Sequence, residues 1–260
     1  MKQENLKLEL NQCITKILES EKKGNFFLDP FKHIIVDNFF SDEIAENSLK
    51  AFQVSERKKW DEVNDEDIEI KMRSNWSSEF DIHEAVLPCV RILNSAPFLD
   101  VMNKLFNIKG LLMDPYFKGG GLNITPKNGL LDIHVDGNFH DKTGAHRRLN
   151  AIVYLNKNWE KGWKGELGLY DKKGQQLIKS VEPIYNRLII FQTNDYSFHG
   201  LPEPINFPDN ENRKSIILYY YSLSARDKEE TNVKGPHSAL WVKKKYNDKK
   251  GNQTRKIYDD

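Results

Sequence analysis

Thiols are scarce in this chain of 260 residues, whose two cysteines, Cys13 and Cys89, form no CxxC pair. The sequence therefore supports neither a disulfide scaffold nor a zinc site built on thiolates, which favours a reducing compartment. No apolar run approaches the roughly 18 residues that a membrane-spanning helix needs. The polar N-terminal stretch MKQENLKLELNQ does not resemble a secretory signal. We therefore expect a cytoplasmic protein.

An excess of charge of one sign is also missing. The chain has 39 basic and 38 acidic residues, and its formal net charge is +1. No basic field marks it as a nucleic-acid-binding protein, so we expect neither a nucleic acid nor a membrane as its partner. Internal repeats and low-complexity linkers are absent from the sequence. Its length and its 38% hydrophobic residues favour one sizeable core, with or without appendages.

Helical patterns dominate the N-terminal part of the chain, residues 1–110. Apolar residues recur at helical spacing over residues 4–21, which predicts an amphipathic helix. The segment HIIVDNFF at 33–40 predicts a strand. Ser41 follows it and is the expected N-cap of a second helix. We expect this region to support a core formed by the rest of the chain.

Two further segments of this region are less regular. Residues 57–82 are highly charged, and we expect a mobile loop, with at most a short strand, as a candidate lid. Residues 83–106 are expected to be mostly helical. Because proline disrupts the interior of a helix, interruptions are expected at Pro88 and Pro97.

Short β-rich runs alternate with turn residues in the next part of the chain, residues 111–224. Eight runs follow one another: LLMDPYF, GLNIT, LLDIHVD, LNAIVYLN, GELGLYD, QLIKSVEPI, RLIIFQT and SIILYYYS. This spacing is typical of an all-β sandwich or barrel and not of an α/β sheet. The remaining residues, 225–260, form a charged tail that is irregular except around Trp241. We expect the three regions to form one structural domain.

Three potential metal ligands lie on strand-like runs of the β-rich part. His134 and Asp136, in LLDIHVDG, are two residues apart and so point to the same side of a strand. His199, in SFHG, lies on a later run. Two histidines and one carboxylate form the facial triad of non-haem Fe(II) oxygenases, although a lone histidine is more often structural. His140 and His146 lie nearby in a polar segment, where we expect solvated or substrate-side residues.

An arginine enters a strand downstream of His199. Arg213 opens the run NRKSIILYYYS, and a guanidinium in a core strand is costly unless it meets an anion. A carboxylate is its best partner, and Ser215 points the same way and adds a hydroxyl. The alternative is an ordinary surface ion pair with Asp209 or Glu211. Together with the triad, the pattern favours a 2-oxoglutarate site.

These segments resemble the Fe(II)/2-oxoglutarate-dependent dioxygenases, in particular the prolyl 4-hydroxylase-like branch. The similarity runs from about Gly120 to Ser222 and comprises GLLDIHVDG, RRLNAIVYLNKNW, WKGELGLYD, RLIIFQT, SFHG and NRKSIILYYYS. The segment FKHIIVDNFFS also resembles the opening of these enzymes, whereas the stretch 57–82 has no counterpart. The resemblance implies a mainly β fold with flanking helices, a double-stranded β-helix of the jelly-roll, cupin-like type. Residues 111–224 would be its catalytic core.

The resemblance also implies the roles of individual residues. His134, Asp136 and His199 would bind Fe(II). Arg213, with Ser215 beside it, would hold the distal carboxylate of 2-oxoglutarate, and Tyr154, in VYLN, would hydrogen-bond the same carboxylate. The implied reaction is hydroxylation of an unactivated C–H bond with O₂ as co-substrate, succinate and CO₂ as co-products, and ascorbate as an accessory reductant.

Several alternatives stay open. The resemblance favours a prolyl residue of a peptide or protein as substrate, and a small-molecule or sugar-derived substrate is the alternative. The chain could also be a non-catalytic jelly-roll module that binds a metal or a sugar, or a zinc or manganese hydrolase with the same three ligands. Arg187 or Arg226 could replace Arg213 in holding the carboxylate. The side chains expected at the mouth of the site are Trp76, Asn138, Phe139, His140 and Trp163.

Overall fold

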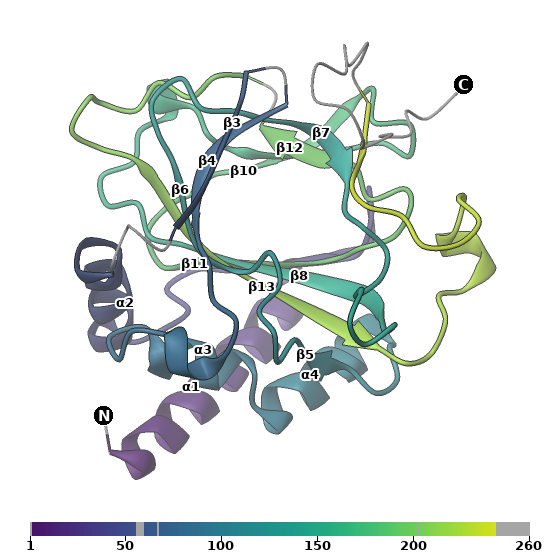
Figure 1. Ribbon diagram of the computed structural model, residues 1–260. Helices are drawn as coiled ribbons and strands as arrows, with labels where there is room; N and C mark the ends of the chain where they lie inside the picture. Colours follow the sequence, from purple (N-terminus) through teal and green to yellow (C-terminus); the bar gives the residue numbers. More distant parts are fainter. Residues whose placement is uncertain (1, 56–59, 67, 202, 243–260) are drawn as a thin grey trace.

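A curled antiparallel sheet with helices on its outer face makes up the computed structural model, which describes residues 2–55, 60–66, 68–201 and 203–242 (Figure 1). The α-helices in these ranges are α1 (Gln3–Lys22), α2 (Asp42–Val54), α3 (Leu87–Leu93) and α4 (Ala96–Phe106). The strands are β1 (Phe26–Phe27), β2 (His33–Val36), β3 (Trp60–Asp65), β4 (Glu69–Ser74), β5 (Leu112–Met113), β6 (Gly121–Thr125), β7 (Leu131–Val135), β8 (His146–Tyr154), β9 (Leu167–Tyr170), β10 (Leu177–Val181), β11 (Arg187–Gln192), β12 (His199–Leu201), β13 (Arg213–Ser222) and β14 (Leu240–Trp241).

Strands from distant parts of the chain alternate across the sheet. Their order is β1-β2-β11-β8-β13-β6-β4-β7-β12-β9-β10, with β3 on β4, β5 on β13 and β14 on β7. The sheet curls so that β11, β8 and β13 form one layer while β7 and β12 lie in the facing layer (Figure 1). Each predicted β-rich run contains a strand, and the architecture is the expected mainly β jelly roll with flanking helices.

The layer of β11, β8 and β13 separates two apolar cores. In β11, Leu188 and Ile190 pack towards the helices, whereas Ile189 and Phe191 face the other layer. This division follows from the strand period of two, because successive side chains point to opposite faces. β8 and β13 alternate in the same way over most of their length. The inner face of this layer therefore borders the space between the two layers, where the candidate site lies.

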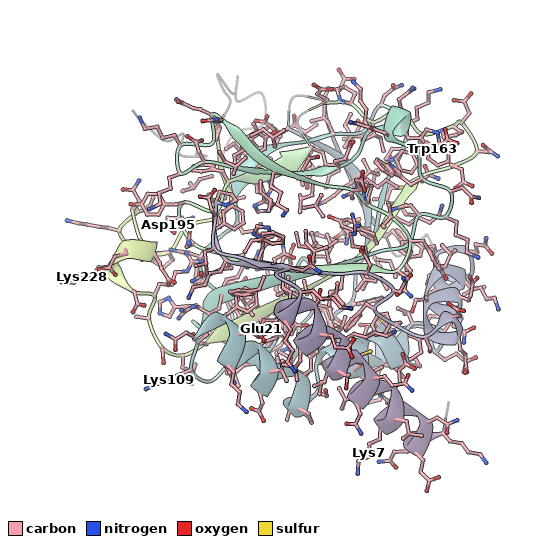
Figure 2. All side chains as sticks on the ribbon, turned by 180° about the vertical axis from the view of Figure 1, so that it is seen from behind. Lys7, Glu21, Lys109, Trp163, Asp195 and Lys228 are labelled. Carbon is pink, nitrogen blue, oxygen red and sulfur yellow. The ribbon has the colours of Figure 1, made fainter. Side chains whose placement is uncertain are left out.

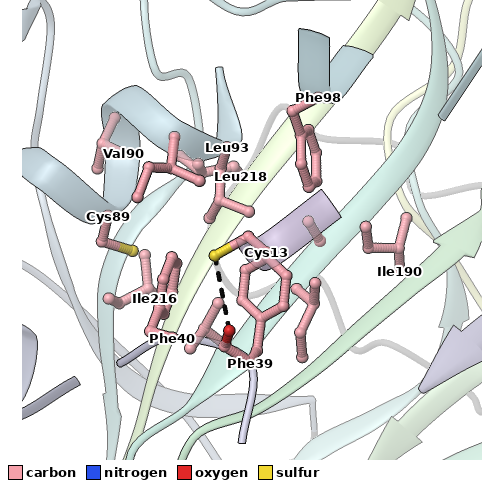
Figure 3. Close-up of a cluster of buried hydrophobic side chains, with 14 of the residues drawn as sticks. Cys13, Phe39, Phe40, Cys89, Val90, Leu93, Phe98, Ile190, Ile216 and Leu218 are labelled. Atoms are coloured by element: carbon pink, nitrogen blue, oxygen red, sulfur yellow. Dashed lines mark hydrogen bonds between the residues drawn. The ribbon is translucent and has the colours of Figure 1, made fainter. Parts of the chain in front are cut away.

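The outer core, between the sheet and the helices, contains both cysteines as free, buried thiols (Figure 3). The Cys13 thiol donates to the carbonyl oxygen of Phe39 at 3.5 Å. Burial raises the pKa of both thiols, that of Cys89 to about 12. Because a protonated thiol is a poor nucleophile and metal ligand, these cysteines act as packing residues of the core.

The stretch 83–106 is mostly helical and divided, as expected. Pro97 lies in the first turn of α4, directly after the break that follows Leu93, and Pro88 lies in the first turn of α3. Proline costs little there, because the first turn needs no backbone donor inside the helix. Ser41 is the N-cap of α2 as predicted, but its hydroxyl makes no capping bond. Its backbone N–H donates instead to Glu9 Oε1 at 2.6 Å.

The charged stretch 57–82 contains a β-hairpin, so the prediction of a loop was wrong for its described residues. β3 and β4 pair from Trp60 with Ser74 to Asp65 with Glu69, and β4 also pairs with β6. Ion pairs hold the hairpin, among them Arg73 with Asp61 at 3.0 Å. Residues 57–59 and 67 of this stretch lie outside the described residues.

Among the described residues, no helix combines the length and hydrophobicity that crossing a bilayer requires.

Candidate active site

Strands β7 and β12 bring the three predicted metal ligands together. His134 of β7 pairs with His199 of β12, and Asp136 follows the end of β7. All three side chains are buried, and their ligand atoms lie within 4.8 Å of one another. In the described part of the chain, this is the one group of three such side chains close enough to share a metal ion.

Backbone carbonyl groups orient both imidazoles. His134 Nδ1 lies 2.8 Å from the carbonyl oxygen of Asp132, and His199 Nδ1 lies 2.9 Å from that of Ser197. Each Nδ1 therefore donates to its carbonyl oxygen, and each Nε2 faces Asp136, whose nearest oxygens are 3.6 and 3.9 Å away. Burial, together with neighbouring His134, lowers the pKa of His199 to about 4, so this imidazole is neutral. Two oriented imidazoles and one carboxylate form a donor set that fits Fe(II).

The Asp136 carboxylate is held from β8 as well. Arg147 Nη1 lies 3.6 Å from Asp136 Oδ2, and Asn150 Nδ2 donates to the same oxygen at 3.3 Å. The Arg147 guanidinium is fixed in turn, because it stacks 3.9 Å from the centre of the Tyr219 ring. Burial would raise the pKa of Asp136, but His134 and Arg147 hold it well below its usual value. The carboxylate is therefore ionised at neutral pH, as a metal ligand must be.

The triad borders a cavity of about 540 Å³ that Arg213 also lines. Arg213 is only 5% exposed, and its Nε donates to the carbonyl oxygen of Gly165 at 2.8 Å. Gly165 has a φ of +87°, and a Cβ there would lie 3.1 Å from Arg213 Cδ, so this approach requires glycine. Asp209 and Glu211 pair with lysines instead. Among the described residues no carboxylate lies within ion-pair distance of Arg213, and a buried cation of this kind favours an anionic ligand.

Tyr154 and Ser215 accompany Arg213. Ser215 lines the cavity and is buried, whereas Tyr154 lies behind the lining with its ring centre 5.0 Å from the guanidinium carbon of Arg213. Burial raises the pKa of Tyr154, and Arg213 opposes this rise. Burial lowers the pKa of Arg213, and Tyr154 opposes that shift. The Tyr154 hydroxyl makes no hydrogen bond of standard geometry in the described part of the chain.

Neither alternative arginine is available to hold an anion in this cavity. Arg187 pairs with Asp37 through Nε and Nη2, the latter at 3.0 Å. Arg226 pairs with Asp195 at 2.8 Å. Neither arginine is among the residues that line the cavity. The geometry therefore favours Arg213 over both.

The side chains expected at the mouth divide into two groups. Phe139 and His140 line the cavity. His140 is only 2% exposed, so it is not the solvated residue that was one of its two expected roles, and its substrate-side role stays a prediction. His146 begins β8. The cavity lining does not include the other three, Trp76, Asn138 and Trp163.

Sequence reasoning missed Arg147, which reaches the cavity because β8 contains a bulge. Leu149 pairs with Tyr220, whereas Arg147 pairs with Tyr221, so Arg148 has no partner on β13. An extra residue of this kind reverses the alternation of faces along a strand. The odd-numbered Arg147 therefore shares the inner face with the even-numbered residues beyond the bulge. The only sequence signal is the pair of arginines in RRLNAIVY, which does not reveal a bulge.

Residues 120–221 match the family model described as the 2OG-Fe(II) oxygenase superfamily. This part of the chain is similar to the 2OG-Fe(II) oxygenase superfamily. The predicted resemblance is thereby confirmed, as are Fe(II), 2-oxoglutarate and O₂ as the cofactors and co-substrate that the superfamily uses. The match covers the triad residues, Tyr154, Arg213 and Ser215.

Two curated relatives are prolyl hydroxylases. The prolyl 3-hydroxylase OGFOD1 of Mus musculus is 24% identical over 203 residues, which are 76% of this chain and 34% of that protein. The prolyl hydroxylase EGLN3 of Homo sapiens is 29% identical over 93 residues, which are 36% of this chain and 35% of that protein. The chain thus spans about a third of the length of either relative.

Two solved structures share the fold. A Pseudomonas putida prolyl-4-hydroxylase superimposes with a TM-score of 0.54 at 16% identity, covering 81% of this chain and 99% of that chain. A Phytophthora capsici prolyl 4-hydroxylase gives a TM-score of 0.59 at 15% identity, covering 85% of this chain and 68% of that chain. At these identities the likeness shows the fold alone, and it confirms the predicted double-stranded β-helix.

Proposed function

We propose that this chain is an Fe(II)- and 2-oxoglutarate-dependent dioxygenase that hydroxylates an unactivated C–H bond. The observation that carries the proposal is the buried guanidinium of Arg213, which borders the same cavity as three clustered metal-ligating side chains. The proposed metal ligands are His134, Asp136 and His199. The proposed ligands of the distal 2-oxoglutarate carboxylate are Arg213, Tyr154 and Ser215.

The residues of the chain bind and orient the reactants. When bound, Fe(II) supplies the activation of O₂ that couples oxidation of 2-oxoglutarate to succinate and CO₂ with hydroxylation of a substrate. The Nε2 atoms of His134 and His199 and the Asp136 carboxylate would hold the metal, because the hydrogen bonds from both Nδ1 atoms to backbone carbonyl oxygens orient the rings. Arg213 anchors the remote end of the keto acid. The burial of the triad residues would limit the access of water to the reacting centre.

The proposed substrate is a prolyl residue of a peptide or protein. Support comes from the relatives, because OGFOD1 and EGLN3 are named prolyl hydroxylases. A prolyl hydroxylase from Trichoplax adhaerens that was solved with a peptide fragment also shares the fold, with a TM-score of 0.51 at 15% identity. Ascorbate is the proposed accessory reductant. A cytoplasmic location is proposed on the two buried free thiols.

Succinate formation tests the function directly. The purified chain is incubated with Fe(II), 2-oxoglutarate, ascorbate and a library of proline-containing peptides, and succinate is measured together with the mass gain of one oxygen atom per peptide. Both products are expected in air and neither without O₂. Asp136→Ala is the matched inactive control.

The same assay separates the alternatives. A non-catalytic binding module would release no succinate under any condition. A zinc or manganese hydrolase would ignore 2-oxoglutarate and would work without O₂. Peptides that stay unmodified while a small-molecule library gives hydroxylated products would contradict the prolyl substrate but not the oxygenase chemistry.

A further inference from the structure

One wall of the cavity is formed by a C-terminal segment that crosses from β13 to β7. We call this segment, residues 226–242, the strap. It leaves the end of β13, passes the edge of both layers and reaches β7, where Leu240 and Trp241 form β14 (Figure 1). Figure 2 shows Asp195 beside the part of the strap that carries Lys228.

Three N–H donors of the strap and the imidazole of His237 meet at the carboxylate of Asp195, which is fully buried. Its Oδ1 accepts from Arg226 Nη1 at 2.8 Å and lies 3.1 Å from His237 Nε2. Its Oδ2 accepts the backbone N–H groups of Asn232 at 2.8 Å and Val233 at 3.0 Å. Burial would raise the pKa of Asp195, but His237 and the two N–H groups lower it below its usual value. The strap is therefore fastened to an ionised carboxylate.

A second set of contacts joins the strap to the residues that follow β7, the strand that carries His134. Asn138 Nδ2 donates to the carbonyl oxygen of Gly235 at 3.0 Å, and Asn138 Oδ1 accepts the N–H of His237 at 2.9 Å. A Cβ on Gly137 would lie 3.0 Å from the carbonyl oxygen of His237. The strap and the chain just after Asp136 are thus in van der Waals contact.

The far end of the strap reaches the candidate metal site. Trp241 pairs with His134 between β14 and β7, and the centres of their rings are 4.6 Å apart. Ser238 and Ala239 also line the cavity. The segment that Asp195 fastens therefore packs on one proposed metal ligand and bounds the space left for a substrate.

We propose that Asp195 is a positioning residue for the substrate side of the cavity, acting through the strap. By holding Arg226 and His237 it seats Trp241 against His134 and sets the width of the space beside the metal site. The claim that the strap positions a substrate rests on the proposed function. The claim that Asp195 holds the strap in place does not, because it can be tested without turnover. Without the charge of Asp195, the buried Arg226 guanidinium loses its carboxylate, which is strongly unfavourable. The strap is then expected to separate from β7, with loss of the pairing between β14 and β7, while the other strand pairs of the sheet are kept.

Hydrogen exchange measures the seating without any ligand. In Asp195→Asn, the amides of Asn232, Val233 and Val242 are expected to exchange about tenfold faster or more, the factor that corresponds to losing a hydrogen bond to a charged group. The control is Asp81→Asn, which removes a carboxylate that accepts two backbone N–H groups, at 2.8 and 3.1 Å, in a different turn. Wild-type exchange at all three strap amides in Asp195→Asn would overturn the proposal.

Tryptophan fluorescence reports whether Trp241, at the other end of the strap, lies close to the metal site. Paramagnetic Mn(II) at the triad is expected to quench Trp241, and Trp241→Phe identifies its share among the five tryptophans. In Asp195→Asn this share of the quenching is expected to be lost, although the Mn(II) signal in electron paramagnetic resonance still shows binding. Unchanged quenching in the variant, or wild-type binding without quenching of Trp241, would overturn the proposal. A wild type that binds no Mn(II) would refute the proposed function, while the exchange data would still decide the role of Asp195.

A positioning role also predicts a selective effect on turnover. With the proline-containing peptide library, Asp195→Asn is expected to form less succinate relative to the peptide-free reaction, at an unchanged KM for 2-oxoglutarate. A raised KM for 2-oxoglutarate with an unchanged ratio would contradict the proposal. If Asp195→Asn does not fold, His237→Phe removes the imidazole at the same oxygen and is expected to accelerate exchange of the same amides.

Discussion

Replacing Arg213 by methionine is expected to weaken 2-oxoglutarate binding strongly while leaving the stability of the ligand-free protein almost unchanged. The loss of the hydrogen bond from Nε to Gly165 costs about 1.5–3 kcal/mol. The exchange of a buried charge for an apolar side chain of similar length returns about 1–4 kcal/mol. Because these changes oppose each other, the melting temperature Tm of the ligand-free variant is expected to stay within about 5 °C of the wild type.

The effect on the ligand is much larger. Two charge-assisted hydrogen bonds from a guanidinium to a carboxylate contribute about 3–6 kcal/mol, so their loss raises the Kd for 2-oxoglutarate about 10²–10⁴-fold. At 100 times Kd, 2-oxoglutarate stabilises the wild type by about 2.7 kcal/mol. This corresponds to a rise in Tm of about 5–10 °C for a chain of this size. The same concentration is expected to stabilise Arg213→Met by less than about 0.5 kcal/mol.

Thermal unfolding of the Mn(II)-loaded protein without O₂, followed by circular dichroism with and without 2-oxoglutarate, measures both quantities. Arg187→Met is the matched control, because Arg187 already pairs with Asp37 outside the cavity. A rise in Tm with 2-oxoglutarate as large in Arg213→Met as in the wild type would show that another group binds the carboxylate. A fall of more than about 10 °C in the ligand-free Tm would show instead that Arg213 is chiefly structural.

Three further predictions concern the same molecule. His134→Ala, Asp136→Ala and His199→Ala are each expected to abolish Mn(II) binding in electron paramagnetic resonance while circular dichroism still reports a folded protein; binding retained by any variant would remove that residue from the ligand set. Tyr154→Phe is expected to raise the KM for 2-oxoglutarate up to about tenfold, the effect of one lost hydrogen bond; an unchanged KM would mean that Tyr154 only packs against the arginine. Asp195 has a folded-state pKa below its usual value, so its stabilisation is present above about pH 4 and is lost as the pH falls through the folded-state pKa. The difference in free energy of unfolding between the wild type and Asp195→Asn, measured with urea, should therefore shrink as the pH falls below about 4, and a difference that does not shrink on acidification would contradict the assignment.

Local patterns were misleading wherever a tertiary contact decided the outcome. Charges along the stretch 57–82 concealed the hairpin of β3 and β4, because its order comes from pairing with β6 and β7 and not from an alternating apolar face. Pro88 and Pro97, where interruptions were expected, lie in the first turns of α3 and α4, a position that proline tolerates. Periodicity gives the type of an element more securely than its ends, since the ends depend on where the backbone finds other partners.

The sequence by itself determined the strands of the jelly roll, the spacing of His134 and Asp136, and the presence of an arginine at the start of β13. These features follow from the period of two along a strand, which is a local property of the backbone. Only the tertiary structure decided that His199 lies opposite His134 and that Arg213 has no protein carboxylate within ion-pair distance among the described residues. It also decided that a bulge turns Arg147 inward and that Asp195 fastens the strap. Each of these depends on register and on contacts between residues far apart in the chain, which the local alternation of side chains does not encode.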